Sequence, residues 1–228
     1  MEIHSSWESF FIRQKQTLCD IFESIKETEY HPVMPYTLRF AKMPVDSIKV
    51  VILGQDPYPA REAATGRAFE VGTLKSWSEP FRQVSLKNIL RAVYGVYTGK
   101  SSYTPFSQIK AEIESGAFPV LPPSKLFESW EKQGVLLLNT AFTVEVGKPG
   151  SHSELWNGFT NELIKYLSDN THAVWFLWGS HAASFSELIK GEKYISRHPM
   201  MCSEKAKDDF LKNPCFAETS CMIDWRGI

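Results

Sequence analysis

"VVILGQDPYPAREAATGRAFEV", residues 50–71, contains the segment that decides the fold. Val50 to Leu53 are consecutive apolar residues, and Gly54 ends the run. A short apolar run bounded by a turn residue is typical of a strand that is buried on both faces of a parallel sheet. Asp56 follows at the strand tip, where Pro57 restricts its backbone. The segment therefore predicts a core strand that ends in a rigidly held carboxylate.

Three more segments repeat this pattern of an apolar run that ends in polar residues. They are Val135–Leu138 before Asn139, Ala173–Trp178 before Gly179, and Lys193–Ser196 before Arg197 and His198. Helical periodicity, with apolar residues three and four positions apart, occurs at 7–25, 84–94, 155–167 and 182–189. Strands that alternate with helices pair in parallel through right-handed crossovers. We therefore predict an α/β fold of three layers, with a central four-stranded parallel sheet flanked by helices.

The chain is expected to form a single domain over residues 1–228. Residues 98–128 are rich in proline and glycine and show little periodicity, so we expect a surface insertion there rather than a second domain. The composition, 43% apolar and 22% charged, is that of an ordinary globular protein. The net charge of -1 excludes a protein that is basic overall, as many nucleic-acid-binding domains are. Any DNA binding must therefore come from local clusters of basic residues.

Cysteine and histidine spacing indicates no disulfide framework and no metal site, and no cofactor is implied. The amino-terminal segment lacks a signal-peptide core, and no apolar run is long enough to span a bilayer. These features predict a soluble protein of a reducing, intracellular compartment, cytoplasmic or, in a eukaryotic or viral setting, nuclear.

Polar residues that follow the strands are expected to meet, because parallel sheets bind ligands beyond the carboxyl ends of their strands. Asp56, Asn139, Gly179, Ser180 and His198 hold such positions. Each has an ordinary structural interpretation as a turn, cap or satisfied core residue. Their occurrence at the same sheet edge favours a site, in which a rigid carboxylate suits a general base or the stabilisation of a cationic transition state. No dinucleotide, Walker or nucleophile-elbow motif is present.

Four segments, in order, resemble the signature segments of family 1 uracil-DNA glycosylases. They are "GQDPYP" at 54–59, "LLLNTAFTV" at 136–144, "FLWGSHA" at 176–182 and "HPMMCS" at 198–203, with weaker matches "GRAFEV" at 66–71, "SLKNI" at 85–89, "GSH" at 150–152 and "MIDW" at 222–225. The resemblance implies a monofunctional DNA-repair hydrolase that flips deoxyuridine out of DNA, hydrolyses its N-glycosidic bond and leaves an abasic site.

The same resemblance assigns expected roles to individual residues. Asp56 would position water and oppose the positive charge on the sugar, and His198 would stabilise the departing uracil anion. The substrate-binding residues would be Gln55 through its backbone, Tyr58 by excluding thymine, Phe69 by stacking and Asn139 by bonding the uracil edge. The DNA-binding residues would be Ser85, Gly179, Ser180, Met201, Cys202 and Ser203, with nearby cations Arg61, Arg67, Lys148, Arg197, Lys205 and Lys207.

Three departures from the family pattern carry expectations of their own. Pro59 replaces a usual histidine, which predicts a lowered rate. Met201 and Cys202 replace the proline and the leucine that wedges into the base stack, which predicts a bias toward uracil in single strands. Trp77 and Phe81 precede the "SLKNI" segment and either stack on a base or pack under the insertion.

The expected partner is DNA that contains uracil, single- or double-stranded, bound by a monomer without a membrane. The 98–128 insertion is a candidate surface for a protein partner. One alternative function is a weakly active or inactive DNA-binding module of a replication or defence complex. The joint presence of Asp56, Asn139 and His198 argues against it. A glycosylase for a modified uracil is a further alternative, which Tyr58 disfavours because it would exclude bulky 5-substituents.

Overall fold

A computed structural model, which describes residues 3–228, contains the expected four-stranded parallel sheet. Its strands are β2 (Val50–Gly54), β3 (Val135–Asn139), β5 (Val174–Trp178) and β6 (Lys193–Ser196), in the spatial order β3-β2-β5-β6. Every neighbouring pair is parallel, and the register places Gly54 opposite Asn139. The expected strands are confirmed, and β2 and β3 each extend one residue further than the apolar runs.

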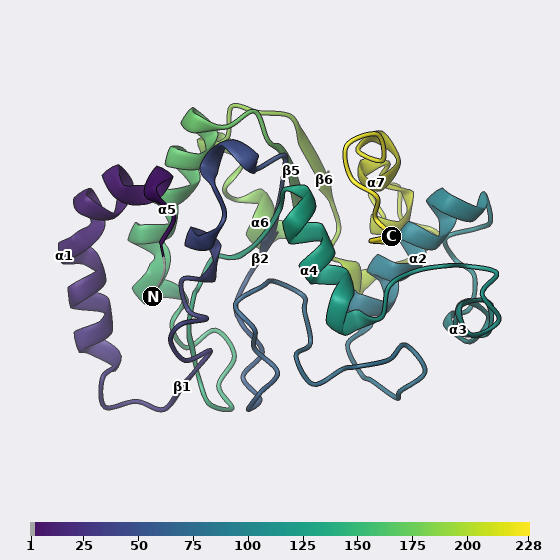
Figure 1. Ribbon diagram of the computed structural model, residues 1–228, viewed down its shortest axis with the longest axis horizontal. Coiled ribbons are helices and arrows are strands. Elements are labelled where there is room, and N and C mark those ends of the chain that lie inside the picture. The colour runs from purple at the N-terminus through teal and green to yellow at the C-terminus, as the bar shows by residue number, and fades with distance from the viewer. Residues whose placement is uncertain (1–2) are drawn as a thin grey trace.

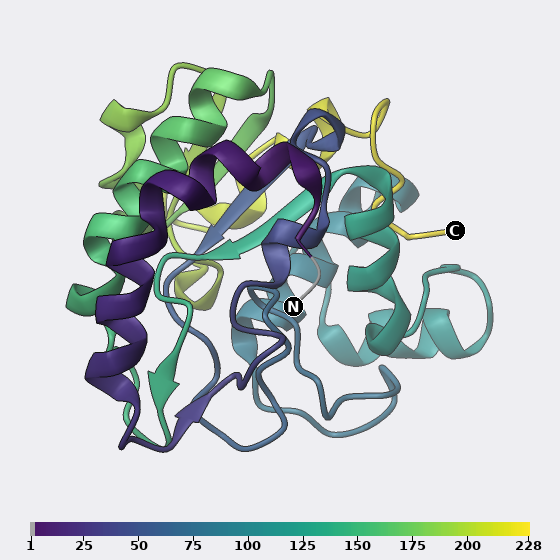
Figure 2. The same cartoon turned by 60° about the vertical axis from the view of Figure 1, so that its left-hand side comes forward.

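Helices cover both faces of the sheet because successive strand residues point in opposite directions. Val50 and Ile52 belong to one buried apolar cluster, and Val51 and Leu53 to another. The first cluster packs against α2 (Val84–Thr98), α4 (Pro123–Gln133) and α7 (Cys215–Glu218), and the second against α1 (Glu8–Ile25) and α5 (Ser153–Asn170). Figures 1 and 2 show α1 and α5 together on one side of the sheet and α2 and α4 on the other. The three-layer prediction is confirmed.

The predicted helix over 182–189 is wrong as one element. The chain forms α6 (Ser180–Ala183) and then a separate 3-10 turn, η4 (Ser186–Leu188). The Ser184 hydroxyl donates to the His181 carbonyl at 2.7 Å. A serine side chain that bonds to the backbone competes with helix continuation, which accounts for the break.

Residues 98–128 are more regular than their composition predicts. They contain α3 (Phe106–Glu114) and the beginning of α4, and the side chains of Ile109 and Phe118 are buried in the same cluster as α2. Pro123 in the first turn and Gly134 just after the last turn are typical helix boundary residues, a signal that would have identified α4. The expectation of a surface stretch with little periodicity is therefore wrong for these helices.

Of the two interpretations of Trp77 and Phe81, packing is confirmed. Trp77 is 3% exposed, and its Nε1 donates to the Leu121 carbonyl at 2.8 Å. The Phe81 ring lies edge-on to Phe106 of α3, with 5.5 Å between ring centroids. Both aromatic side chains are thus used to hold the segment that contains α3 against the body of the protein.

Short elements complete the described chain. Two-residue strands β1 (Tyr30–His31) and β4 (Val144–Glu145) pair antiparallel and tie the chain that follows α1 to the chain that follows β3 (Figure 2). Sequence reasoning missed them because two residues show no periodicity. The remaining 3-10 turns are η1 (Ser5–Trp7), η2 (Arg39–Lys42), η3 (Val45–Ser47), η5 (Pro199–Met201) and η6 (Phe210–Lys212). Within residues 3–228, the helices lack the length and apolar character that crossing a membrane requires.

Candidate active site

A cavity of about 510 Å³ opens at the carboxyl end of the sheet. Its lining includes seven of the residues predicted for the site, namely Gln55, Asp56, Tyr58, Phe69, Ser85, Asn139 and His198. A smaller cavity of about 150 Å³ shares Gln55 and His198 with it and adds Gly179 and Ser180. Residues that are far apart in the sequence thus meet at one sheet edge, as the strand ends predicted.

The tip of β2 is fastened to the tip of β3 by three hydrogen bonds. The Thr140 N–H donates to the Gly54 carbonyl at 3.0 Å, and the Ala141 N–H donates to the Gln55 carbonyl at 2.9 Å. The Thr140 hydroxyl donates to the same Gln55 carbonyl, also at 2.9 Å. The turn that carries Asp56 is therefore held rigidly beside Asn139.

The Asp56 carboxylate is half-buried and accepts a hydrogen bond from the Gly150 N–H through Oδ2 at 2.7 Å. The loop that contains Gly150 is itself anchored, because Thr143 Oγ1 accepts from Trp156 Nε1 at 2.7 Å and lies 2.9 Å from His152 Nδ1. A backbone N–H has no residue-type signal, so sequence reasoning assigned no role to Gly150. One carboxylate oxygen of Asp56 is oriented by this bond, and the residue lines the cavity.

His198 follows β6 and is prepared as a neutral hydrogen-bond donor. Its Nδ1 accepts from the Met200 N–H at 3.2 Å, so the proton of the neutral ring lies on Nε2. Burial lowers the pKa of His198 below its usual 6.5, which keeps the ring uncharged at neutral pH. The ring therefore presents one N–H donor.

A second histidine, His181, supports the β2 tip. Its Nε2 lies 2.7 Å from Thr140 Oγ1, whose own hydrogen goes to the Gln55 carbonyl, so the imidazole donates. Burial lowers the pKa of His181, and the charge of Asp56 opposes that shift. His181 was not singled out from the sequence because its contact with residue 140 depends on tertiary structure.

Phe69 and Tyr58 form apolar walls of the cavity. The Phe69 ring centroid lies 5.5 Å from that of Trp178 and 6.0 Å from that of His198. The Ala68 N–H donates to the Leu137 carbonyl at 3.2 Å, which holds the Phe69 segment against β3. Burial raises the pKa of Tyr58 to about 12, so its phenol stays neutral. Asn139 is 6% exposed, and its amide can offer both a donor and an acceptor to a ligand.

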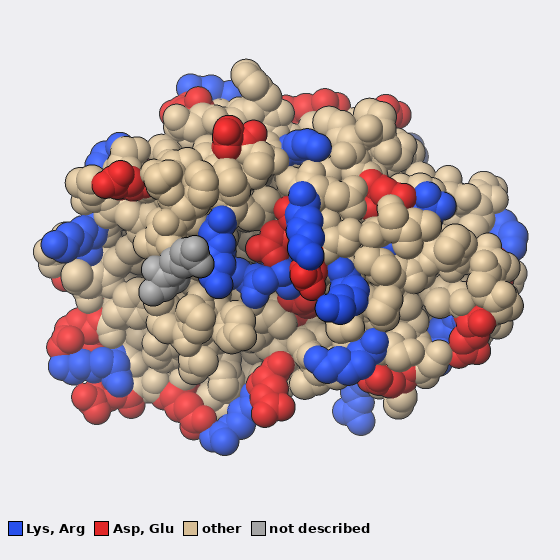
Figure 3. Space-filling view, viewed as in Figure 1, with Lys and Arg blue, Asp and Glu red and all other residues tan. Residues whose placement is uncertain are grey.

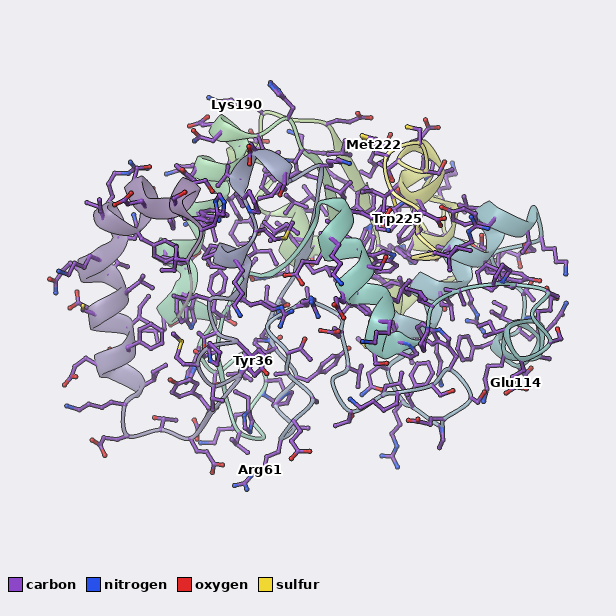
Figure 4. The ribbon with its side chains drawn as sticks, viewed as in Figure 1. Tyr36, Arg61, Glu114, Lys190, Met222 and Trp225 are labelled. Atoms are coloured by element: carbon purple, nitrogen blue, oxygen red, sulfur yellow. The ribbon has the colours of Figure 1, made fainter. Side chains whose placement is uncertain are left out.

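Most cations that were expected near the site are paired with carboxylates. Arg67 lines the cavity, but it forms ion pairs with Glu70 and Glu131, and all three side chains are largely buried. The other pairs are Arg61 with Glu29, Arg197 with Asp208 and Lys148 with Glu145. Figure 4 shows Arg61 reaching outward from the loop after β2, and Figure 3 shows basic and acidic side chains interspersed on the face in view. The positive charge that these residues could offer to an anionic ligand is therefore reduced by neighbouring acids.

The loop of residues 198–203 borders the cavity through Met200, which sequence reasoning did not single out. Met201 is 62% exposed, and Ser203 is exposed as well. Cys202 is half-buried, and its thiol donates to the Pro199 carbonyl at 3.2 Å. Burial raises the pKa of Cys202 to about 12, so the thiol is neutral. Met201, Cys202 and Ser203 do not line the cavity. Cys202 faces its own loop, and Met201 is exposed.

Comparisons with known proteins agree on one family. The sequence model of the Uracil DNA glycosylase superfamily matches residues 40–219. The chain is 36% identical to the uracil-DNA glycosylase of Alcelaphine herpesvirus 1 (strain C500), over 90% of this chain and 74% of that protein. It is 31% identical to the uracil-DNA glycosylase of Azotobacter vinelandii (strain DJ / ATCC BAA-1303), over 99% and 88%. The fold matches the wild-type UNG crystal structure from Nitratifractor salsuginis, with a TM-score of 0.76, 22% identity, and coverage of 98% of this chain and 92% of that one.

Proposed function

The chain belongs to the uracil-DNA glycosylase superfamily, and from this membership we infer that it hydrolyses the N-glycosyl bond of deoxyuridine in DNA. The products are free uracil and an abasic site. The observation that carries the proposal is the cavity that gathers Asp56, Asn139 and His198 from the ends of three strands. A binding module without turnover is not favoured, because the similar proteins are named as enzymes.

Uracil is recognised after the nucleotide leaves the base stack and enters the cavity. The Phe69 ring offers a stacking face. The Asn139 amide bonds the pairing edge of uracil, whereas cytosine presents the opposite donor and acceptor pattern and would leave these groups unpaired. Tyr58 occupies the space that the methyl group of thymine would need, so thymine is excluded by overlap.

In bond cleavage, Asp56 stabilises the positive charge that develops on the sugar, and His198 stabilises the negative charge that develops on uracil. Water held by Asp56 adds to the sugar carbon as the bond between that carbon and the base nitrogen breaks. The carboxylate opposes the positive charge of the oxocarbenium-like transition state and then takes the proton that the water loses. The bonding electron pair leaves with uracil, whose developing negative oxygen accepts from the Nε2–H of His198. Because the pKa of His198 is lowered, the ring acts as a neutral donor at neutral pH.

DNA is held by hydroxyl groups and loop amides rather than by a basic surface. Ser85 lines the main cavity, and Gly179 and Ser180 line the smaller one. Ser203 is an exposed residue of the loop of residues 198–203. Such groups bond phosphate oxygens without net positive charge. Cys202 is too short and too enclosed to wedge into a base stack, so we propose that uracil in single strands is processed better than uracil in duplexes.

The test is uracil release from oligonucleotides that carry one uracil, single-stranded and duplex, with alkaline cleavage at the abasic site as the readout. Asp56→Asn keeps an oxygen for the Gly150 N–H but removes the negative charge. We expect its rate to fall well beyond tenfold, a barrier increase above about 1.4 kcal/mol, with DNA binding largely retained.

The matched control is Glu62→Gln, which makes the same chemical change on the same loop at an exposed residue. It should cleave at the wild-type rate. Retention of more than about a tenth of the activity by Asp56→Asn would remove Asp56 from the central role. Absence of cleavage by folded wild-type protein that still binds DNA would instead support the binding module.

A further inference from the structure

The loop of residues 198–203 is fixed to the body of the protein by a hydrogen bond from α2. Asn88 of α2 donates its side-chain N–H to the Pro199 carbonyl at 2.5 Å, and the Cys202 thiol donates to the same oxygen. Within the loop, the Met201 N–H donates to the His198 carbonyl at 2.8 Å. The bonds cover the first half of the loop, so the backbone around His198 has little freedom.

Two flexible apolar side chains project from this fixed backbone. Met200 is 58% exposed and Met201 is 62% exposed. Met200 also lines the main cavity, and Met201 follows it directly in the chain. Exposed thioethers beside the cavity suit contact with stacked bases, since methionine is among the apolar side chains that insert between base steps.

The second half of the loop is held by Asp209, which is 1% exposed. Its Oδ2 accepts from the Ser203 N–H, and its Oδ1 accepts from the Leu211 N–H at 3.0 Å. A third donor comes from far away in the sequence, because the Tyr103 hydroxyl donates to Oδ1 at 2.8 Å. Burial, followed by this hydrogen bond to Asp209, raises the pKa of Tyr103. The phenol therefore remains a donor over the whole physiological range.

We infer that Tyr103 and Asp209 are positioning residues for base flipping from duplex DNA: they hold the loop of residues 198–203 so that Met200 and Met201 meet the base stack beside the cavity. The inference rests on the proposed function. It gives the segment 98–105, whose purpose the sequence left open, a role in the reaction. A side chain that inserts between bases offsets the free energy of unstacking only if its backbone is already rigid. A flexible loop would lose conformational entropy on binding, which weakens the contact.

Tyr103→Phe tests the inference, because it keeps the ring and removes only the donor to Asp209. We expect kcat/KM for uracil in a duplex to fall about tenfold, while kcat/KM for the same uracil in a single strand falls less than about twofold. A single strand has no stacked partner to displace, so it should be insensitive to the loop. Amide hydrogen exchange at residues 200–203 should also become faster in the variant.

Tyr97→Phe is the matched control. It removes a hydroxyl that accepts from the Trp225 N–H at 2.9 Å, remote from the loop, and should leave the duplex to single-strand ratio at its wild-type value. An equal fall on both substrates in Tyr103→Phe, or an unchanged ratio, would overturn the positioning role while leaving the glycosylase proposal intact. A wild-type protein that releases no uracil from either substrate would overturn the proposed function and this inference with it.

Discussion

Gly54 shows how one absent methyl group shapes the cavity. A Cβ at this residue would lie 2.4 Å from Asn139 Oδ1 and 2.8 Å from the Ala68 Cβ. The backbone of both neighbours is held in place, because Asn139 belongs to β3 and the Ala68 N–H donates to the Leu137 carbonyl of the same strand. Glycine at the strand end is therefore required for the position of the amide that we propose to read uracil.

Phe69 is held in an unfavourable backbone conformation. Its φ of 64 lies in the left-handed region that non-glycine residues rarely adopt. Such a conformation costs about 1–3 kcal/mol and persists only where the surroundings impose it. The buried ion pair of Arg67 with Glu70 spans this residue, and Arg67 also pairs with Glu131. The strain coincides with the ring that we propose to stack on the base, as expected for a site that is organised before its ligand arrives.

Tyr58→Ala tests the exclusion of thymine. Removal of the phenol enlarges the cavity where a 5-methyl group would lie, so the variant should release thymine from a thymine-containing single strand, which the wild type should not do. Base release is measured by chromatography and by alkaline cleavage. Tyr58→Phe keeps the ring and should stay specific for uracil. An alanine variant that leaves thymine in place would show that another group guards the cavity.

At the scale of elements, the helix α3 and the chain after it are part of the core. Phe118 is buried beneath them, and its ring lies edge-on to Tyr94 of α2 at 5.1 Å between centroids. Tyr94 in turn donates its hydroxyl to Glu112 of α3 at 2.9 Å. The segment is thus bonded to α2 through apolar and polar contacts together, and its removal would expose one face of that helix.

Phe118→Ala should therefore lower the free energy of unfolding of the whole protein. The expected loss is about 3–5 kcal/mol, the usual effect of truncating a buried phenylalanine. Urea denaturation followed by tryptophan fluorescence measures it. Ser107→Ala on the exposed side of α3 is the control, with an expected change within about 0.5 kcal/mol. A near-neutral Phe118→Ala would mean that the segment folds independently of the core.

For the whole molecule, one buried and two half-buried histidines couple stability to pH. Burial lowers the pKa of His152, His181 and His198 below the usual 6.5. Below that value the unfolded chain takes up protons that the folded protein does not. Stability is therefore fully present above pH 6.5 and decreases as the pH falls from there through the lowered pKa values. Carboxylates with lowered pKa values, such as Asp224, reduce the stability of the folded protein only in more acidic solution.

The expected result is a lower urea midpoint at pH 5.5 than at pH 7.5. His152→Gln should reduce this pH dependence, since a glutamine can still bond the Thr143 hydroxyl without taking up a proton. His172→Gln, at an exposed histidine, is the control and should leave the pH dependence as it is. Equal midpoints at the two pH values in the wild type would contradict the coupling.

The sequence by itself determined the sheet and the edge at which the site lies. Val50–Leu53 and the three similar runs predict parallel strands because burial on both faces leaves a purely apolar run, a local property of neighbouring residues. Asp56, Asn139 and His198 follow those runs, so the topology of a parallel sheet was sufficient to bring them together. The resemblance to a known family supplied their expected roles, which remain proposals.

Only the tertiary structure decided which groups orient these residues. The Gly150 N–H on Asp56, His181 on Thr140, and Tyr103 on Asp209 join residues that are distant in the sequence. The inward thiol of Cys202 and the exposure of the Met200 and Met201 side chains were likewise not predictable. Hydrogen bonds and burial depend on which segments the completed fold packs against one another, and residue periodicity reports only on neighbours along the chain.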